Sequence, residues 1–413
     1  MAGTRDVVVV GGGIAGSALA TVLARDDLDV LVLERQVAYR DKVRGETMQP
    51  WGVAEVIELG LLDTLIEAGG GHGTRFVPYD EAMDPDLAEA FAIPLDELLP
   101  DVPGSLNVGH PEACEALTQA AEAAGAAVVR GIGDVTVTPG SRPTVAYQHE
   151  ESDRSVACRL VVGADGRNSG VQRQLGVETH TTSARTIGSG MLVDEVEGWP
   201  EHREALGSEG DVHFLVFPRP GGKVRLYLWF DIAQKGRFTG PDRQREFLDA
   251  FRLGCVPAAD ALAGARPAGP CASYPSTDTW TDRPTTEGVV LVGDAAGWSD
   301  PIIGQGLAIA MRDTRSVADV LRGGDDWSPA AFAPYVAERS ERMRRLRVTS
   351  KLATHLRCSF GPDGASRRQA MFEQVFADPL MLGPFGLAPL AGPETVPAEA
   401  FEPENVDRIL AVA

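Results

Sequence analysis

The chain has 413 residues, of which 44% are hydrophobic and 23% charged. At roughly 100–200 residues per domain, this length predicts two or three structural units, and the composition excludes disordered, collagen-like and disulfide-rich chains. The formal net charge of −21 repels phosphate backbones and anionic lipids, so we expect neither nucleic acid nor a membrane as a partner. Five scattered cysteines without metal-ligand spacing, and no apolar run of about 18–20 residues, favour a cytoplasmic protein with no metal site and no secretory leader.

The first strand–helix–strand unit carries a nucleotide-binding pattern. An apolar, β-branched run at 6–10 predicts a buried strand, and G-x-G-x-x-G leads from it into a predicted helix over 14–24 and a strand over 29–33. Such glycines let the backbone approach a pyrophosphate at the helix N-terminus, and an acid after the second strand binds ribose hydroxyls. The expected dinucleotide contacts are Gly11, Gly13, Ile14, Ala15, Gly16, Glu34 and Arg35. The motif alone does not separate FAD from NAD.

Two later strands end in a similar way. A predicted strand over 160–165 ends at Asp165 in G-A-D-G-R-N-S, and another over 289–294 ends at Asp294, ahead of D-P-I-I-G-Q-G and a predicted helix over 307–321. Ligands collect at the carboxyl ends of strands in open α/β sheets, so we expect these segments to converge on one elongated cofactor.

These three motifs, in this order and spacing, resemble the flavoprotein monooxygenases of the p-hydroxybenzoate hydroxylase fold, over residues 5–350. The resemblance implies an α/β protein with a discontinuous, Rossmann-like FAD-binding domain of the GR2 type, an antiparallel β-sheet substrate domain and C-terminal helices. The expected bounds are 1–75, 104–180 and 280–330 for the FAD domain, 76–103 and 181–279 for the substrate domain, and 331–413 for the C-terminal helical region.

The resemblance also implies roles for single residues. Asp294 would hydrogen-bond the FAD ribityl chain, and Asp165 would lie near the pyrophosphate. The loop before the helix over 307–321 would turn backbone N–H groups toward the flavin pyrimidine edge and stabilise negative charge there. The cofactor contacts implied in this way are Arg44, Asp165, Gly293, Asp294, Gly304, Gly306 and Leu307. Those implied at the reacting centre are Arg44, Pro301 and Gly304.

One position departs from the family pattern. Relatives place an Arg or Gln on the FAD diphosphate at the start of a helix that we predict over 111–124, whereas this chain has His110 there. His110 either takes over the diphosphate contact, which would make FAD affinity weaker or pH-dependent, or simply caps the helix.

The middle of the chain reads as alternating strands over 188–193, 212–217 and 224–230, with a hairpin turn at 218–222. The resemblance makes this an antiparallel sheet above the flavin, with one face toward a substrate cavity. The substrate candidates are Met191, His213, Arg225, Tyr227 and Trp229. The alternative is that these side chains only pack the sheet, and the sequence leaves open which face points inward.

Two further segments have expected positions. The acidic segment 76–103 is expected to line or cover the cavity entrance. The arginines of a long amphipathic helix over 329–358 are expected to be solvated or paired with acids, with a dock for a nicotinamide phosphate as the alternative.

The reaction implied by the resemblance is flavin-dependent oxygen transfer. NADPH or NADH would reduce FAD, O₂ would form a C4a-hydroperoxide, and one oxygen atom would pass to a small aromatic or polyunsaturated substrate of secondary metabolism, such as antibiotic biosynthesis. A separate flavin reductase is an open alternative. Three other functions stay open: a halogenase, a polyene reductase or dehydrogenase, and a non-catalytic FAD-binding escort. The halogenase is disfavoured because no lysine lies in 69–100 and no W-x-W-x-I-P is present.

Overall fold

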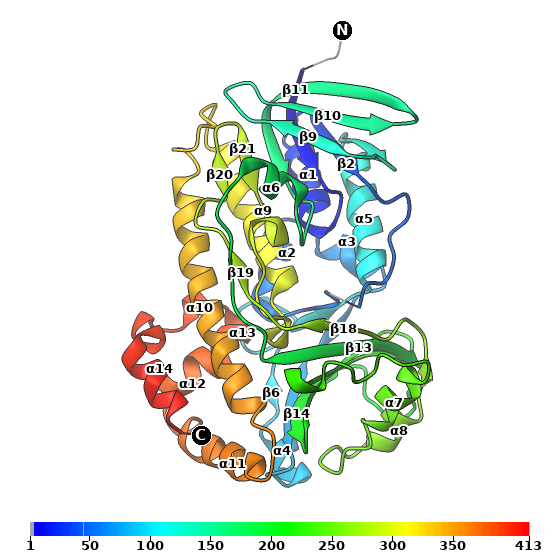
Figure 1. Ribbon diagram of the computed structural model, residues 1–413, viewed down its shortest axis with the longest axis vertical. Coiled ribbons are helices and arrows are strands. Elements are labelled where there is room, and N and C mark those ends of the chain that lie inside the picture. The colour runs from blue at the N-terminus through cyan, green and yellow to red at the C-terminus, as the bar shows by residue number, and fades with distance from the viewer. Residues whose placement is uncertain (1–3, 44, 413) are drawn as a thin grey trace.

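The computed structural model describes residues 4–43 and 45–412. Two large sheets form its frame, one above the other in Figure 1. The upper sheet has the strand order β20-β21-β11-β1-β2-β8 and is parallel from β21 to β8. These strands are β1 (Thr4–Val10), β2 (Val30–Glu34), β8 (Ala127–Arg130), β11 (Ser152–Gly163), β20 (Thr285–Thr286) and β21 (Val289–Leu291).

Alternate side chains of the upper sheet enter two separate cores. Val7 and Val9 of β1 pack with helices α1, α5 and α9, whereas Val8 and Val10 pack with the hairpin β9–β10 and with α6. The bounds are α1 (Ile14–Arg25), α5 (His110–Ala123), α6 (Gly170–Leu175), α9 (Gly306–Arg322), β9 (Val135–Thr138) and β10 (Thr144–His149). The helices predicted over 14–24, 111–124 and 307–321 are confirmed, with ends within one residue.

The lower sheet has the order β17-β13-β16-β15-β14-β5-β6, and β18 also pairs with β13. Its strands are β5 (Arg75–Asp80), β6 (Ile93–Pro94), β13 (Thr186–Asp194), β14 (Arg203–Glu209), β15 (Val212–Arg219), β16 (Lys223–Asp231), β17 (Arg266–Pro267) and β18 (Ala272–Pro275). The three predicted strands form its centre. The β15–β16 turn is shorter than predicted, because Pro218 and Arg219 still pair with Val224 and Lys223.

The two faces of the lower sheet have different partners. One face packs against α7 (Arg243–Asp249) and α8 (Ala259–Ala263), around Phe247 and Phe251. The other face, with Leu215 and Trp229, shares a core with the upper domain. The sequence does not predict β14 or β5, and β5 builds part of the acidic segment 76–103 into this sheet.

Smaller elements connect the two sheets. A three-stranded sheet of β3 (Thr47–Met48), β7 (Ser105–Asn107) and β4 (Gly71–Gly73) contacts β15 through β7. The remaining connecting elements are α2 (Pro50–Glu58), α3 (Leu62–Glu67), α4 (Pro85–Ala90), β12 (His180–Thr181) and β19 (Thr279–Trp280).

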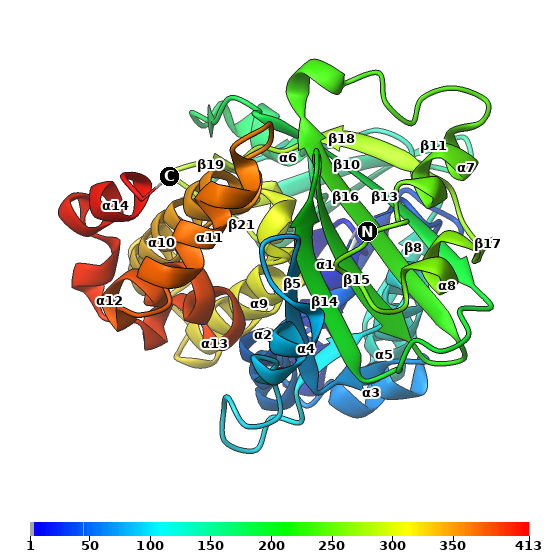
Figure 2. The ribbon, with the colours of Figure 1, turned by 90° about the horizontal axis from the view of Figure 1, so that it is seen from below.

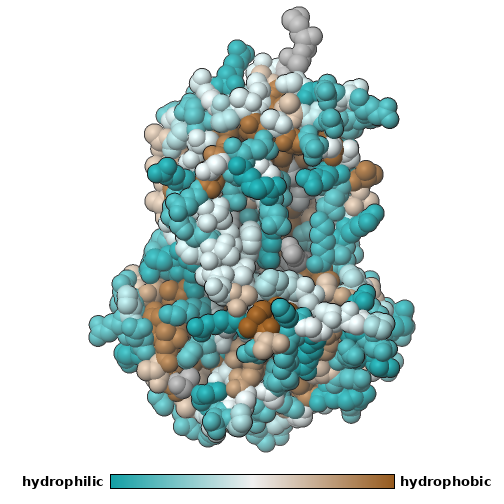
Figure 3. Space-filling model, in the orientation of Figure 1, coloured by the Kyte–Doolittle hydropathy of each residue, from teal (hydrophilic) through white to brown (hydrophobic). Residues whose placement is uncertain are grey.

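The last part of the chain is helical. The long helix α10 (Ala333–Arg357) packs on α9, and the shorter helices lie beside the lower sheet (Figure 2). These are α11 (Gly364–Gln374), α12 (Pro379–Leu382), α13 (Ala388–Ala391) and α14 (Pro403–Leu410). Hydrophilic residues cover most of the face in Figure 3, and none of the described helices combines the length and apolarity needed to cross a membrane.

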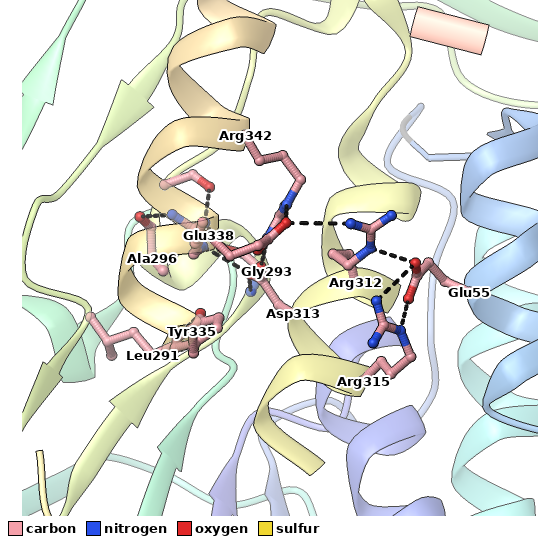
Figure 4. Close-up of polar contacts among 12 residues, drawn as sticks. Glu55, Leu291, Gly293, Ala296, Arg312, Asp313, Arg315, Tyr335, Glu338 and Arg342 are labelled. Atoms are coloured by element: carbon pink, nitrogen blue, oxygen red, sulfur yellow. Dashed lines mark hydrogen bonds and ion pairs between the residues drawn. The ribbon is translucent and has the colours of Figure 1, made fainter. Parts of the chain in front are cut away.

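A buried ionic cluster joins α9 and α10 to the loop after β21 (Figure 4). Asp313 of α9 is fully buried, accepts from Arg339 Nε at 2.9 Å and Arg342 Nη2 at 2.6 Å, and also accepts the Gly293 backbone N–H at 2.8 Å. The Arg339 guanidinium donates to three backbone carbonyls of residues 293–297 at 3.0–3.1 Å. The cluster therefore fixes the loop that carries Asp294.

We expect Asp313→Asn to destabilise the protein by about 3–5 kcal/mol, because it leaves two buried guanidinium groups without their shared charge. The matched control is Asp319→Asn on the same helix, where an exposed ion pair with Arg315 contributes about 0–1 kcal/mol. Urea unfolding of both variants measures the difference. Equal losses of unfolding free energy would contradict the assigned role of Asp313.

Candidate functional site

An elongated cavity of about 990 Å³ lies between the upper sheet and the inner face of the lower sheet. Its volume is at the upper end of the range for small-molecule sites. The predicted cofactor and reaction-centre residues that line it are Gly11, Gly13, Ile14, Ala15, Glu34, Arg35, His110, Asp165, Gly293, Asp294, Pro301, Gly304, Gly306 and Leu307. The fold therefore brings together motifs that are up to about 290 residues apart in the chain.

The glycine-rich loop of the nucleotide-binding motif is held in place by Glu34, the acid at the end of β2. Glu34 accepts the N–H groups of Gly12 and Gln36, each at 2.7 Å, so its carboxylate is fixed at the cavity wall. A Cβ on Gly16 would lie 1.9 Å from the Gly11 carbonyl oxygen, which explains the need for glycine where α1 meets β1. Gly16 thus packs the helix on the strand and does not line the cavity.

The two aspartates at the later strand ends have different surroundings. The Asp165 carboxylate accepts from the Ser169 hydroxyl and from the N–H groups of Gly170 and Val171, so it holds the start of α6. Asp294 pairs with Arg167 Nε at 3.2 Å, and its side chain is 30% exposed. The Asp294 carboxylate therefore has fewer hydrogen bonds within the protein than the Asp165 carboxylate.

A loop closed by a buried acid forms another part of the wall. Asp300 accepts the Ile302 N–H at 3.0 Å, and its own N–H donates to Asp278 Oδ1 at 3.0 Å. Burial raises the pKa of Asp300 to about 7, and the neighbouring Asp278 adds to the shift. Gly304 ends this turn with φ +63°, a conformation that favours glycine. The turn leads the chain into the N-terminus of α9.

The segment before β3 is tied to the lower sheet. Arg225 of β16 donates from Nη2 to Asp41 and Glu46, both at 2.7 Å, and from Nε to Glu46 at 2.9 Å. Between these two acids, the buried Val43 has φ +56°, which is rare for a β-branched residue. Arg44, predicted as a cofactor and reaction-centre residue, lies outside the described residues.

His110 begins α5 and faces the same segment. Its ring lies near Gly45, where an added Cβ would be 3.3 Å from His110 Cδ2. Burial lowers the pKa of His110 below its usual value, only partly opposed by Glu46. The imidazole is thus neutral at neutral pH in this structure.

Aromatic side chains form the wall on the lower sheet. Tyr227 packs edge-on against Phe217, with ring centroids 6.2 Å apart, and at 5.8 Å from Trp229. Trp229 Nε1 donates to Ser276 Oγ at 3.0 Å. Burial raises the pKa of Tyr227 well above its usual value, so its phenol stays protonated and can donate to a ligand. This face combines aromatic rings with the phenol groups of Tyr227 and Tyr274.

Three of the five substrate candidates do not line the cavity. Met191 points to the opposite face of the sheet, because in β13 the neighbouring Gly190 is the residue that faces inward beside Tyr227. His213 is fully buried and bonded to Ser208 Oγ at 3.0 Å, and Arg225 is occupied by its two acids. These three predictions are therefore corrected, while Tyr227 and Trp229 do line the cavity.

Two other expectations also change. No described residue of 76–103 lines the cavity, because β5 and β6 lie at the far edge of the lower sheet. In α10, Arg339 and Arg342 are buried ion-pair residues, and Arg344 and Arg345 pair with Glu341. Pairing with acids, one of the stated alternatives, thus holds for these four arginines.

Sequence reasoning does not single out several residues of the wall: Lys42, Thr47, Asp134, Arg167, Tyr274 and Trp298. Arg167 and Trp298 lie within or just after the recognised motifs, so their position in the chain is a usable signal. Tyr274 comes from a short strand that carries no sequence signature, and only the tertiary structure places it.

The residues of the cavity fit FAD. A Cβ on Gly13 or Gly306 would meet no atom within 4 Å, so these backbone positions border open space of the kind a bound pyrophosphate or flavin ring needs. The buried Trp298 Nε1 has no hydrogen-bond partner among the described residues, and a ligand could supply one. Arg35, Lys42 and Arg167 place positive charge along the cavity of an otherwise acidic protein.

Comparison with known proteins agrees with this geometry. Residues 4–349 match the family model described as an FAD binding domain. The chain is 25% identical to squalene monooxygenase SE1 of Panax ginseng over 78% of this chain and 59% of that protein. It is 27% identical to ubiquinone hydroxylase UbiL of Rhodospirillum rubrum (88% and 84% covered) and 28% identical to a menaquinone reductase of Mycobacterium tuberculosis (78% of each).

Solved structures share the fold at low identity. The p-nitrophenol 4-monooxygenase PnpA of Pseudomonas putida aligns with a TM-score of 0.73 at 18% identity, covering 98% of this chain and 99% of that one. The flavin-dependent halogenase CmlS aligns with 0.74 at 18% identity, covering 99% and 77%. At such identities the likeness shows the fold alone. With the family match over 4–349, these findings show that the chain belongs to the FAD binding domain family and has the flavoprotein hydroxylase fold.

Proposed function

We propose that the protein is an FAD-dependent monooxygenase that uses NADPH or NADH and O₂ to insert one oxygen atom into a small organic substrate. The observation that carries the proposal is the shared cavity, in which the cofactor loops of the upper domain face an aromatic wall of the lower sheet. FAD would supply the redox and oxygen chemistry when bound. The protein would bind it, orient the substrate and exclude water.

Different residues along the cavity would contact different parts of FAD. Glu34 would accept from ribose hydroxyls, Asp294 would contact the ribityl chain, and the N-terminus of α9 would face the flavin pyrimidine edge. Asp165 would act indirectly, by holding α6 and its loop against the pyrophosphate region. Pro301 and Gly304 would border the reacting centre.

The aromatic wall favours an apolar, flat or polyunsaturated substrate. Phe217, Tyr227 and Trp229 offer ring faces, and the Tyr227 phenol offers one hydrogen bond for orientation. The relatives named for squalene, ubiquinone and menaquinone suggest the same chemical class. We place the reaction in the cytoplasm and in secondary metabolism, including antibiotic biosynthesis, with either direct NAD(P)H reduction or a separate flavin reductase.

A second candidate is a flavin-dependent reductase of a quinone or polyene. The observation that favours it is the 28% identity to a menaquinone reductase, which covers 78% of both chains. The two functions share FAD and an apolar substrate. They differ in whether product formation requires O₂.

The test uses FAD-loaded protein, NADPH and a panel of naphthols, quinones and polyprenyl chains. We expect substrate to accelerate NADPH oxidation in air and one labelled oxygen atom from O₂ to appear in the product, measured by mass spectrometry. If NADPH leaves the flavin oxidised, a partner reductase is added before the assay is repeated. Reduced product formed without O₂ would favour the reductase, and brominated product in bromide would favour a halogenase.

Tyr227→Phe provides the matched site control for this assay. It should lower the rate at subsaturating substrate by about 5- to 30-fold, since one ligand hydrogen bond is lost. Tyr147→Phe, on strand β10 of the upper sheet, changes a phenol that does not line the cavity and should leave the rate unchanged. Equal effects of the two variants would contradict the placement of substrate against the lower sheet.

FAD affinity should depend on pH through His110. A diphosphate beside the imidazole would favour its protonated form, so binding takes up a proton and affinity should rise as pH falls from 7.5 to 5.5, by about 3- to 10-fold. His110→Gln should remove this pH dependence. Quenching of flavin fluorescence on binding measures the FAD affinity of both proteins. The same change of affinity with pH in the two would exclude His110 from the diphosphate contact.

A further inference from the structure

A buried carboxyl group without a cation lies one strand away from the cavity wall. Glu204 of β14 is fully buried, and its neighbour Ala205 pairs with Val216 of the adjacent strand β15. No arginine or lysine of the described chain pairs with Glu204. Burial raises the pKa of Glu204 to about 7. Its Oε2 has no hydrogen-bond partner among the described residues.

The other carboxyl oxygen organises a chain of hydrogen bonds. Glu204 Oε1 accepts from the Ser105 hydroxyl and from Asn107 Nδ2, the latter at 2.8 Å. Asn107 Oδ1 in turn accepts from the Thr47 hydroxyl at 2.7 Å. Thr47 lines the cavity, so this chain leads from a buried acid to the ligand space.

The Glu204 carboxylate sets the order of donors and acceptors in this chain as the structure has it. An amide has one donor end and one acceptor end, and Glu204 Oε1 accepts whether the carboxyl is ionised or carries its proton on Oε2. Asn107 therefore turns Nδ2 to Glu204 and Oδ1 to Thr47. The single hydroxyl hydrogen of Thr47 is used on Asn107, and the described residues offer its oxygen no second partner.

We propose that Thr47 presents only a hydrogen-bond acceptor to the cavity and so selects a bound molecule that offers an N–H or O–H donor. Glu204 and Asn107 are the positioning residues that set this polarity. Asn107 separates Glu204 from the cavity, and an amide does not readily pass a proton, so Glu204 acts by orientation. The donor can come from FAD or from the organic substrate.

The first experiment compares Thr47→Val with Thr47→Ser by binding alone, so it is independent of oxygen transfer. FAD titration of the apoproteins by fluorescence tests the cofactor as the source of the donor. Titration of the FAD-loaded proteins with 1-naphthol and with 1-methoxynaphthalene, followed by the visible flavin spectrum, tests the substrate. We expect Thr47→Val to lose about 5- to 30-fold in one of these arms, and Thr47→Ser to retain wild-type binding.

The second experiment tests the positioning residues. Glu204→Gln keeps a carbonyl oxygen for Asn107 and should retain the wild-type binding. Glu204→Leu leaves the Asn107 amide free to turn, so it should lose part of the affinity in whichever titration Thr47→Val weakens. Ser105→Ala, which removes the other hydrogen bond to Glu204, is the control, and near-UV circular dichroism confirms folding. The proposal would be overturned if Thr47→Val kept the wild-type affinity for FAD and the wild-type ratio of affinities for 1-naphthol and 1-methoxynaphthalene.

Discussion

The site depends first on the buried Asp313, which two arginines and a backbone N–H share. Through Arg339 it fixes the loop 293–297, and through α9 it fixes the helix whose N-terminus borders the cavity. Without Asp313, the buried Arg339 guanidinium would have no acid among the described residues and Arg342 would keep only Glu338, so the groups stabilise the fold as a set. The position of Asp294 beside the cavity follows from this cluster.

A second constraint is the strongly acidic charge of the chain. Coulomb repulsion at a net charge of −21 opposes a dianionic pyrophosphate, so local features must overcome the global field. The structure supplies helix N-termini, open glycine backbone and a few cations such as Arg35 and Arg167 along the cavity. Acids near the site are mostly occupied: Glu34 accepts two N–H groups, and Glu46 is neutralised by Arg225.

The sequence predicts the parts of the site that local chemistry encodes. Glycine-rich turns and acids at strand ends have signatures within a few residues, and Gly13, Asp294 and Gly304, which carry such signatures, line the cavity. Period-two alternation groups Tyr227 with Trp229 and with Arg225, but it cannot show that Asp41 and Glu46, which are 184 and 179 residues away in the chain, bind Arg225. Met191 shows the same limit, because strand pairing decides which face of β13 meets the cavity.

The central claim is that FAD occupies the space against Gly13 and Gly306. The most direct measurement is FAD affinity of the Gly13→Ala and Gly306→Ala apoproteins beside their free energy of unfolding. A new methyl at either position meets no protein atom within 4 Å, so folding should be unchanged, or up to about 1 kcal/mol more stable for Gly306→Ala in its helix. We predict that FAD affinity nevertheless falls at least about tenfold, or about 1.4 kcal/mol. Unchanged affinity in both folded variants would contradict the account.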